Sequence, residues 1–303
     1  MGIGILSKKY SEMKPLFQYR NGNYTVTLYP DGTKELFTEE DAFHPLFPDS
    51  IDLKITARCD LLCPMCHEAS LPDGAHGRLD APFLARLHPG TELAVGGGNP
   101  LTHPMLMPFL TRMKGQGVVV NLTVNERHVT PYSDLLDRLI KQDLIKGLGI
   151  SLSEYKRETF AFAGAYPHAV LHAICGVAEP ERLLSMAAPS LKLLLLGYKH
   201  KGRGAAFDGP AVARRRSTLS RLLPALAKRY GILSFDNLAL AQLHIRERMA
   251  PGRFAACYMG DDGESSMYVD LVTGTFGRSS VAEERYPLLS GAEEMLSFLH
   301  RNN

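Results

Sequence analysis

Short apolar segments alternate with longer amphipathic segments along most of the chain after Pro48. The apolar segments have the length of strands, and the stretches between them carry helix start signals, such as Asp80 with Pro82 close behind, or the helical periodicity of residues 212–230. Repeated βα units predict a parallel sheet with right-handed crossovers, in which chemistry gathers beyond the carboxyl ends of the strands. The expected strands are residues 51–56, 92–95, 118–124, 147–152, 169–174, 191–196 and 232–235.

Both ends of the chain carry a different pattern, which is typical of antiparallel hairpins. Residues 16–37 contain three short strand segments separated by an Asn-Gly turn and a Pro-Asp-Gly turn. Near the other end, two strand segments flank Thr273-Gly274, and a last helix is expected over residues 292–300. The simplest organisation is a barrel-like α/β core with β additions at both ends. The expected units are residues 1–50, 51–240 and 241–303.

The amino-acid composition narrows the class of protein but indicates no particular catalytic or binding site. The chain has 303 residues, of which 45% are hydrophobic and 22% charged, as in soluble globular proteins and unlike disordered, collagen-like or coiled-coil chains. A formal net charge of +2 predicts neither a nucleic-acid partner nor an anionic membrane surface. The densest apolar run, residues 193–196, is far too short to cross a bilayer, so we expect a cytoplasmic protein.

Three of the five cysteines fall within one short segment. Cys59, Cys63 and Cys66 follow the first core strand with the spacing Cys-x3-Cys-x2-Cys, and an odd number of cysteines argues against a disulfide framework. Closely spaced thiolates are soft ligands that suit an iron–sulfur cluster or zinc. A cluster with three protein ligands leaves one metal position open, and an open position is what a catalytic site needs.

Other interpretations of this segment must be weighed against a cluster. Residues Cys63 to His67 match a c-type haem attachment sequence, but that attachment belongs to exported proteins and no export signal is seen. A redox pair of Cys63 and Cys66 leaves Cys59 unexplained, and a structural zinc ion needs His67 or His76 as its fourth ligand. Metal-free thiols are disfavoured by their local density. The spacing therefore favours an iron–sulfur cluster, with zinc as the main alternative.

A second motif follows the second core strand, where the glycine-rich turn Gly96-Gly97-Gly98-Asn99 ends in proline. Together with the cysteine spacing, this turn resembles the radical S-adenosylmethionine (SAM) superfamily over residues 51–235. The resemblance implies an α/β fold, a partial (β/α) barrel of the TIM-like type, whose three clustered cysteines hold a 4Fe-4S cluster with SAM on the fourth iron. It also implies reductive cleavage of SAM to a 5′-deoxyadenosyl radical, which abstracts hydrogen from a substrate.

The same resemblance assigns contacts to SAM. Gly97, Gly98 and Asn99 would receive its methionine end, with Asn99 in place of the usual acid, so that an amide oxygen accepts a hydrogen bond without adding charge. Met65 stands where the family usually has an aromatic residue beside the adenine, and methionine is a tolerable change because that contact is partly through the backbone. Polar groups after the third and fourth strands commonly meet the ribose or carboxylate, and the alternative is a turn or helix cap. Here these groups are Asn125, Ser151 and Ser153.

Later strand ends carry charged and reactive side chains. Lys199 and Arg203 lie on a glycine-rich loop after the sixth strand, where they are candidates for binding an anionic group of the substrate, the alternative being a solvated basic loop. Asp236, after the seventh strand, is a candidate for orienting a substrate hydroxyl or amine, or for capping a helix. Cys175, at the end of the fifth strand, is a candidate hydrogen-atom donor, although a lone buried cysteine usually packs.

We therefore expect a radical SAM enzyme that acts on a small metabolite or nucleotide-like substrate, with an electron carrier such as a flavodoxin or ferredoxin as its partner. No auxiliary cluster is expected, because only Cys257 remains in the tail, whereas peptide-modifying members often carry a cysteine-rich extension. A radical enzyme acting on a peptide or protein is the nearer alternative. A non-catalytic iron–sulfur or zinc protein is the more distant one.

Overall fold

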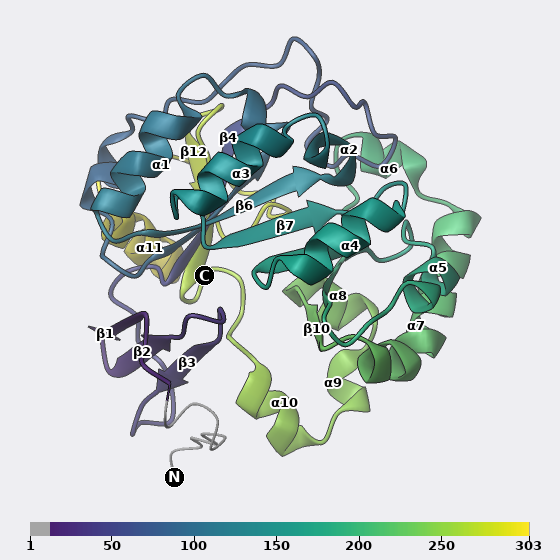
Figure 1. The fold of residues 1–303 in the computed structure, drawn as a ribbon. Helices are drawn as coiled ribbons and strands as arrows, with labels where there is room; N and C mark the ends of the chain where they lie inside the picture. The colour runs from purple at the N-terminus through teal and green to yellow at the C-terminus, as the bar shows by residue number, and fades with distance from the viewer. Residues whose placement is uncertain (1–12, 303) are drawn as a thin grey trace.

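The computed structural model describes residues 13–302; residues 1–12, where the expected N-terminal extension begins, and residue 303 lie outside the described part. The three-stranded meander is confirmed, since β1 (Phe17–Asn21), β2 (Tyr24–Leu28) and β3 (Lys34–Phe37) form one antiparallel sheet. Gly22 makes the first turn with a φ of +58°, and the backbone of His44 leaves no room there for a side chain. This small sheet lies beside the main body, at the bottom of Figure 1.

The main body is built on one ten-stranded sheet. Its order is β10-β9-β8-β7-β6-β5-β4-β11-β12-β13, and every pair from β10 to β11 is parallel. Neighbouring strands from β4 to β10 follow one another along the chain, as the βα pattern predicts. The strands are β4 (Ser50–Thr56), β5 (Glu92–Gly97), β6 (Val119–Asn125), β7 (Gly147–Ser151), β8 (Ala169–Ile174), β9 (Lys192–Leu196), β10 (Ile232–Phe235), β11 (Ser266–Asp270), β12 (Thr275–Gly277) and β13 (Tyr286–Pro287).

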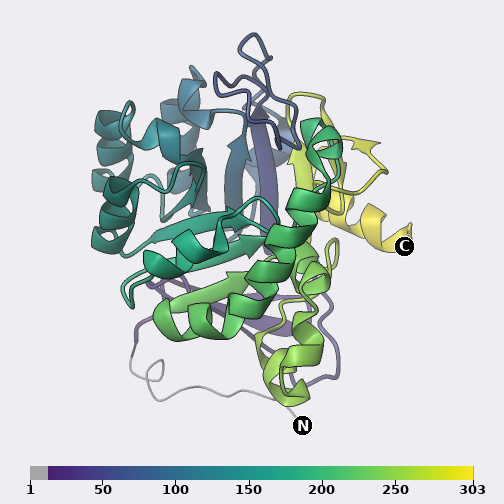
Figure 2. The ribbon, with the colours of Figure 1, turned by 90° about the vertical axis from the view of Figure 1, so that its right-hand side faces the viewer.

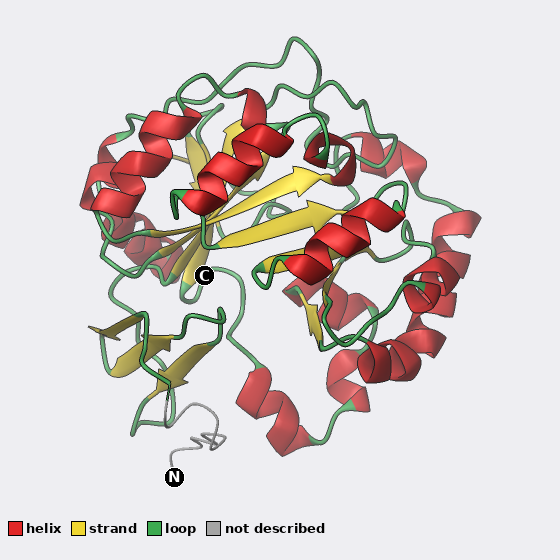
Figure 3. Ribbon diagram, viewed as in Figure 1, coloured by secondary structure: helices red, strands yellow, loops and turns green. Residues whose placement is uncertain are grey.

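Helices surround the sheet on its outer side (Figure 3). The longer ones are α1 (Leu106–Gly115), α3 (Ser133–Lys141), α4 (Arg157–Ala165), α7 (Pro210–Arg229) and α11 (Ala292–Arg301). The shorter ones are α2 (Glu126–Val129), α5 (Pro180–Ser185), α6 (Arg203–Phe207), α8 (Asn237–Gln242), α9 (Ile245–Arg248) and α10 (Pro251–Cys257), together with the 3-10 turns η1 (Pro82–Arg86) and η2 (Pro100–Thr102). Within residues 13–302, no helix has both the length and the apolar character needed to cross a membrane.

The two faces of the sheet differ in polarity. On β5, Leu93 and Val95 are completely buried in the main core, which includes helix α1, whereas Ala94 between them is only partly buried. On β6, Leu122 is buried in the same core, whereas Asn121 points to the opposite face. Burying one leucine contributes about 1.5–3 kcal/mol, so the outer face holds the helices on the sheet. The inner face is thereby left with polar side chains that can serve a function.

The sheet curves without closing into a full barrel. β10 and β13 stand at its two ends in the described structure and do not pair with each other. Figure 2 shows the curved sheet after a quarter turn, with α7 in green at the front and the C-terminal elements in yellow to the right. The expectation of a partial (β/α) barrel with β additions is confirmed.

Two local expectations differ from the structure. The C-terminal hairpin of β11 and β12 forms as predicted, but β11 also pairs in parallel with β4, so the hairpin continues the main sheet. The helix expected after Asp80 is only the 3-10 turn η1, with no side-chain cap. The Asp80 carboxylate accepts hydrogen bonds from the Arg78 side chain at 3.1 and 3.2 Å, so it does not serve the first turn. A helix start signal needs a free side chain to act.

Candidate functional site

The three clustered cysteines lie on one loop at the carboxyl end of β4. All three thiols are free and partly buried, and they lie within electrostatic range of one another. The Cys59 N–H donates to the carbonyl of Leu71 at 2.8 Å and the Cys66 N–H to that of Cys63 at 3.1 Å. The first bond ties the start of the loop to its end, and the second closes a turn that contains the partly buried Met65. This backbone therefore fixes the place of all three thiols.

The electrostatic setting of the thiols suits a metal. Burial raises the pKa of both Cys59 and Cys63, and the neighbouring thiol of Cys66 raises the pKa of Cys63 further. The positive charges of Arg127 and Arg203 lower the pKa of Cys63. Thiolates crowded in this way repel one another unless a cation lies between them, and a coordinated metal removes the protons outright.

A second set of possible metal ligands lies beside the first of these cysteines. One ligand atom from each of Cys59, Asp60 and His128 lies within 4.8 Å of the other two. The His128 ring nitrogen and the Asp60 carboxylate are hydrogen-bonded at 2.8 Å. Cys59 therefore has a histidine and a carboxylate close by, in addition to the other two thiols within electrostatic range.

The glycine-rich turn at the end of β5 is hydrogen-bonded to the start of the cysteine loop. The Gly98 N–H donates to the Thr56 carbonyl and the Asn99 N–H to the Arg58 carbonyl, both at 2.7 Å. Gly97 has a φ of +113°, and a Cβ atom there would lie 2.4 Å from the Thr56 carbonyl oxygen. Glycine is required because the two backbones approach so closely. The two motifs found in the sequence thus form one structural unit.

Asn99 carries an unsatisfied donor in this unit. The side chain is completely buried, and its oxygen accepts a hydrogen bond from the Leu101 N–H at 3.2 Å as the cap of η2. That bond fixes the orientation of the amide, whose nitrogen then has no hydrogen-bond partner among residues 13–302. A buried donor without a partner costs about 1–3 kcal/mol. The Asn99 side-chain nitrogen is therefore free to donate to a group outside residues 13–302, and the contact of Asn99 with SAM stays a prediction.

Polar residues at the ends of β6 and β7 meet on the inner face. The Ser153 hydroxyl donates to the Asn125 side-chain oxygen at 3.1 Å, and the same oxygen accepts the Arg127 N–H at 2.9 Å as the cap of α2. Ser151 is partly buried and stands beside Asn125 and His172 in the strand register. The structure brings these predicted residues together, and their contact with SAM stays a prediction.

A neighbouring carboxylate shapes the loop after β7. Glu126 is buried, and its two oxygens accept the backbone N–H groups of residues 153–156 at 2.5–3.0 Å. Burial would raise the pKa of Glu126, but these four hydrogen bonds to the charged form hold it below its usual value. Ser153 is thus placed by its backbone as much as by its hydroxyl. Sequence reasoning overlooked Glu126, which lies directly after Asn125.

The cationic loop after β9 is hydrogen-bonded to other parts of the protein. The Lys199 amine donates to the Ser280 hydroxyl at 2.7 Å and lies 3.4 Å from the His67 ring. The Lys201 amine donates to the Ala282 carbonyl at 2.8 Å. Arg203 donates to carbonyls of the cysteine loop, including that of Cys63 at 2.9 Å. The role of Lys199 and Arg203 in binding an anionic substrate stays a prediction.

Asp236 and Cys175 both have structural partners. One Asp236 oxygen accepts the N–H groups of Gly197 and Ala239 at 2.8 and 2.7 Å, so the carboxylate caps α8 and ties it to the end of β9. Burial raises the pKa of Asp236, against the effect of these hydrogen bonds. Burial also raises the pKa of Cys175 to about 12, so its thiol keeps its proton at neutral pH. A direct role for either residue in catalysis stays a prediction.

The inner face also carries charged groups that sequence reasoning missed. Lys54 on β4 pairs with Glu68 of the cysteine loop at 2.5 Å and with Asp270 on β11 at 3.1 Å. Asp52 lies two positions earlier on β4. Its side chain is accessible to solvent, but the many protein atoms around it desolvate the carboxylate and raise its pKa. Alternate positions of a strand share one face, so this charged row was visible in the sequence of β4.

His172 on β8 is a neutral histidine of the same face. The surrounding protein lowers its pKa to about 4. Its ring lies over Gly149, since a Cβ atom at that glycine would come within 2.3 Å of ring carbon Cε1. The space above Gly149 is therefore filled by an imidazole that can donate and accept hydrogen bonds without carrying charge.

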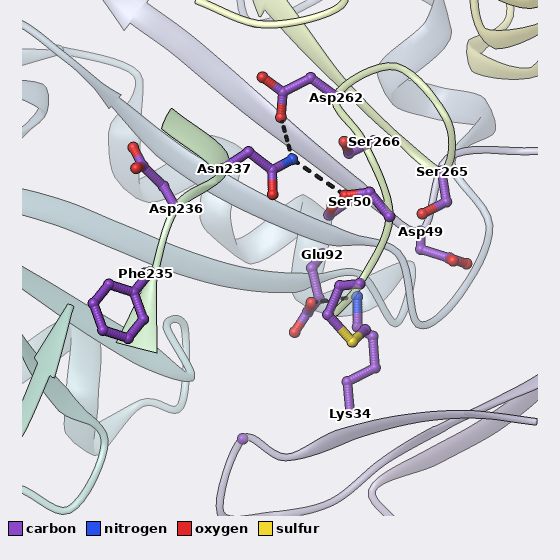
Figure 4. A pocket seen from close by; sticks show the side chains of 13 residues that line it. Lys34, Asp49, Ser50, Glu92, Phe235, Asp236, Asn237, Asp262, Ser265 and Ser266 are labelled. Carbon is purple, nitrogen blue, oxygen red and sulfur yellow. Dashed lines mark hydrogen bonds and ion pairs between the residues drawn. The ribbon is translucent and has the colours of Figure 1, made fainter. Parts of the chain in front are cut away.

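A cavity of about 470 Å³ lies on the inner side of the curved sheet (Figure 4). The end of β10 and the first residues of β4, β5 and β11 all border it, although β10 is six strands away from β4 in the sheet. Asn237 donates to the Asp262 carboxylate at 2.8 Å across one side, as the figure shows. Most of the residues that line it are polar, among them Ser50, Glu92, Asp236, Asn237, Asp262 and Ser266.

Comparison with known proteins bears on the fold. No protein-family model matches this sequence, and no curated protein does. Streptococcus suis SuiB bound to S-adenosylmethionine aligns with 84% of this chain at a TM-score of 0.58 and 11% identity. This chain shares the fold of SuiB. SuiB bound to the precursor peptide SuiA aligns with the same share at a TM-score of 0.57 and 13% identity.

The fold shared with SuiB agrees with the partial barrel that the sequence predicts. The aligned region is 66% and 65% of the two SuiB chains, so this chain matches less than two thirds of SuiB. At such low identity the likeness concerns the fold alone. The chemistry of the site therefore rests on the cysteine loop and the glycine-rich turn.

Proposed function

We propose that this chain is a radical SAM enzyme that modifies a peptide. The observation that carries the proposal is the unit formed by the cysteine loop and the glycine-rich turn, joined by two backbone hydrogen bonds of 2.7 Å at the carboxyl ends of β4 and β5. Such strand ends are where folds built from βα units place their chemistry. This unit contains three free thiols and one buried donor, the Asn99 side-chain nitrogen, which has no partner among the described residues.

The residues of this unit fit the two cofactors that the class requires. Cys59, Cys63 and Cys66 would hold the 4Fe-4S cluster as thiolates; at Cys59 and Cys63, burial disfavours the thiolate unless a metal is bound. The Asn99 N–H group would donate to the carboxylate of SAM, a partner that the described chain does not offer it. When bound, the two cofactors supply one-electron cleavage of SAM and hydrogen abstraction from the substrate.

The peptide substrate is inferred from the structural neighbour and from the basic loop. SuiB is seen with the precursor peptide SuiA bound. Lys199 and Arg203 already donate hydrogen bonds within the protein, which weakens the argument for a small anionic metabolite. A peptide is therefore the better supported substrate. The cytoplasmic location and the flavodoxin or ferredoxin partner stay predictions from the sequence.

The enzyme class is tested by anaerobic reconstitution with iron and sulfide, followed by reduction and addition of SAM. We expect 5′-deoxyadenosine to form with the wild-type chain and with Cys257→Ala, which removes an exposed cysteine far from the loop. We expect none with Cys63→Ala. A reconstituted cluster that neither binds nor cleaves SAM would contradict the proposal and favour an electron-transfer or structural role.

The substrate class is tested by hydrogen transfer. Short peptides encoded beside the gene for this chain are synthesised with deuterated side chains and incubated with the reduced enzyme and SAM. Deuterium in 5′-deoxyadenosine, measured by mass spectrometry, shows that a peptide is the hydrogen donor. If SAM cleavage is instead stimulated only by small anionic metabolites, the peptide assignment is wrong while the enzyme class stands.

A further inference from the structure

The segment around Arg203 is joined to the cysteine loop by three hydrogen bonds from a single residue. The Arg203 backbone N–H donates to the Cys66 carbonyl at 3.0 Å. Its guanidinium donates through Nε to the Cys63 carbonyl at 2.9 Å and through Nη1 to the Ser70 carbonyl at 3.1 Å. Arg203 thus spans the turn that carries two of the three thiols and the end of the loop beyond it.

The glycines on either side of Arg203 let the two segments touch. Gly202 has a φ of +54°, and a Cβ atom there would lie 2.5 Å from the His67 carbonyl oxygen and 2.9 Å from that of Cys66. A Cβ atom at Gly204 would lie 3.2 Å from the Met65 carbonyl oxygen. The backbone of 202–204 therefore packs directly on that of 65–67. Since glycine accepts both the left-handed conformation and the close contact, the sequence around Arg203 is adapted to this interface.

Arginine suits this position for a geometric reason. Its planar guanidinium holds several N–H donors in a fixed fork, so one side chain can bind two carbonyls that lie apart on a loop. Lysine offers a single nitrogen on a flexible stem and cannot bind both carbonyls with the same geometry. The nearby Lys201 makes the contrast clear, because its amine donates to Ala282 and not to the cysteine loop.

We propose that Arg203 is a positioning residue that holds the Cys63–Cys66 turn in its cluster-binding shape, rather than a residue that binds substrate. This inference rests on the proposed function, since it assumes that the turn receives an iron–sulfur cluster. Arg203 acts by donating to the carbonyls of Cys63, Cys66 and Ser70, so the turn is ordered before metal arrives. Its positive charge beside the thiolates also favours the reduced, more negative state of the cluster.

The first test concerns the chain without its cluster. Hydrogen exchange, followed by mass spectrometry, measures the protection of peptides covering residues 59–72 in wild type, Arg203→Ala, Arg203→Lys and Lys201→Ala. We expect faster exchange of this segment in Arg203→Ala, a smaller change in Arg203→Lys, and none in Lys201→Ala. Peptides from β6 to β8 report on global folding and should exchange at the wild-type rate in all four chains.

The second test concerns the reconstituted protein. We expect Arg203→Ala to lose iron to a chelator several-fold faster than wild type, and its cluster to have a more negative reduction potential. The reduction potential of Arg203→Lys should lie between those of Arg203→Ala and wild type, because lysine restores the positive charge. Its loss of iron should stay faster than that of wild type. Lys201→Ala should match wild type in both measurements.

Two outcomes would overturn the proposal. In one, Arg203→Ala keeps wild-type exchange over residues 59–72 and wild-type retention of iron. In the other, the only change is a raised KM for substrate, which would assign Arg203 to substrate binding. If the wild-type chain holds a cluster without cleaving SAM, the proposed function fails, yet exchange and iron retention still test the role of Arg203. Should Arg203→Ala unfold, the neutral variant Arg203→Gln repeats the comparison.

Discussion

The neutral state of His172 predicts how the stability of the protein depends on pH. The surrounding protein lowers the pKa of this side chain from 6.5 to about 4. Between these two values the unfolded chain binds a proton at His172 and the folded chain does not. Because the unfolded state binds more protons, falling pH lowers the free energy of unfolding. Replacing the side chain by asparagine, which does not titrate, removes this contribution.

The size of the effect follows from the two pKa values. At pH 7.5 the contribution of His172 is close to zero, because the side chain is neutral in both states. At pH 5 the proton bound by the unfolded chain lowers the free energy of unfolding by about 2 kcal/mol, and the limit below pH 4 is about 3 kcal/mol. Such a difference lies well within what urea denaturation resolves.

Urea denaturation followed by circular dichroism provides the assay, with every chain prepared free of the cluster. We expect His172→Asn to lose about 2 kcal/mol less stability than wild type between pH 7.5 and pH 5. His44 is exposed, so His44→Asn serves as the matched control and should keep the wild-type pH dependence. Equal losses in all three chains, or an NMR titration of His172 with a midpoint near 6.5, would refute the reasoning.

Three further predictions follow from the site. Alanine at any one of Cys59, Cys63 and Cys66 should abolish iron binding, whereas Cys175→Ala and Cys257→Ala should keep the wild-type iron content after anaerobic reconstitution. Glu126→Ala leaves four backbone N–H groups without their acceptor. It should lower the free energy of unfolding by about 3 kcal/mol and speed hydrogen exchange over residues 153–156. Glu126→Gln keeps one side-chain oxygen and should lower the free energy of unfolding by less. Gly97→Ala should destabilise the fold by about 1–3 kcal/mol, because the φ of Gly97 is +113° and the Thr56 carbonyl blocks the new methyl group. At Gly115 a new methyl group meets open space, so Gly115→Ala should not destabilise the fold. Urea denaturation of both variants checks the contrast.

The elements of the fold could be predicted from the sequence because their signals are local. Each core strand from β4 to β10 appears as a short apolar run, and each expected range agrees with the observed strand to within a residue or two. The pairing of β11 with β4 could not be predicted in this way. Nothing within residues 266–270 records a partner so distant along the chain. The hairpin turn fixes the register of β11 on β12 alone.

The candidate site could likewise be predicted from the sequence only in part. The cysteine spacing and the glycine-rich turn were visible because each motif lies in a few consecutive residues. The contacts of Arg203 were not, because a basic residue in a glycine-rich loop looks the same whether it faces solvent, substrate or a distant carbonyl. The unsatisfied nitrogen of Asn99 likewise depends on the place of Leu101, which only the structure gives. Contacts between side chains and backbone groups of separate loops can be identified only in the three-dimensional structure.

The position of β4 between β5 and β11 has a consequence for biosynthesis. The first neighbour is translated soon after β4, but the second follows about two hundred residues later, which takes roughly ten to forty seconds at usual rates of elongation. Until then the strand that leads into the cysteine loop has an open edge, which is prone to pair with other chains. Iron delivery to a nascent polypeptide would therefore reach a loop whose supporting strand is still incomplete. A truncation before β11 would leave β4 without this partner while keeping Cys59, Cys63 and Cys66.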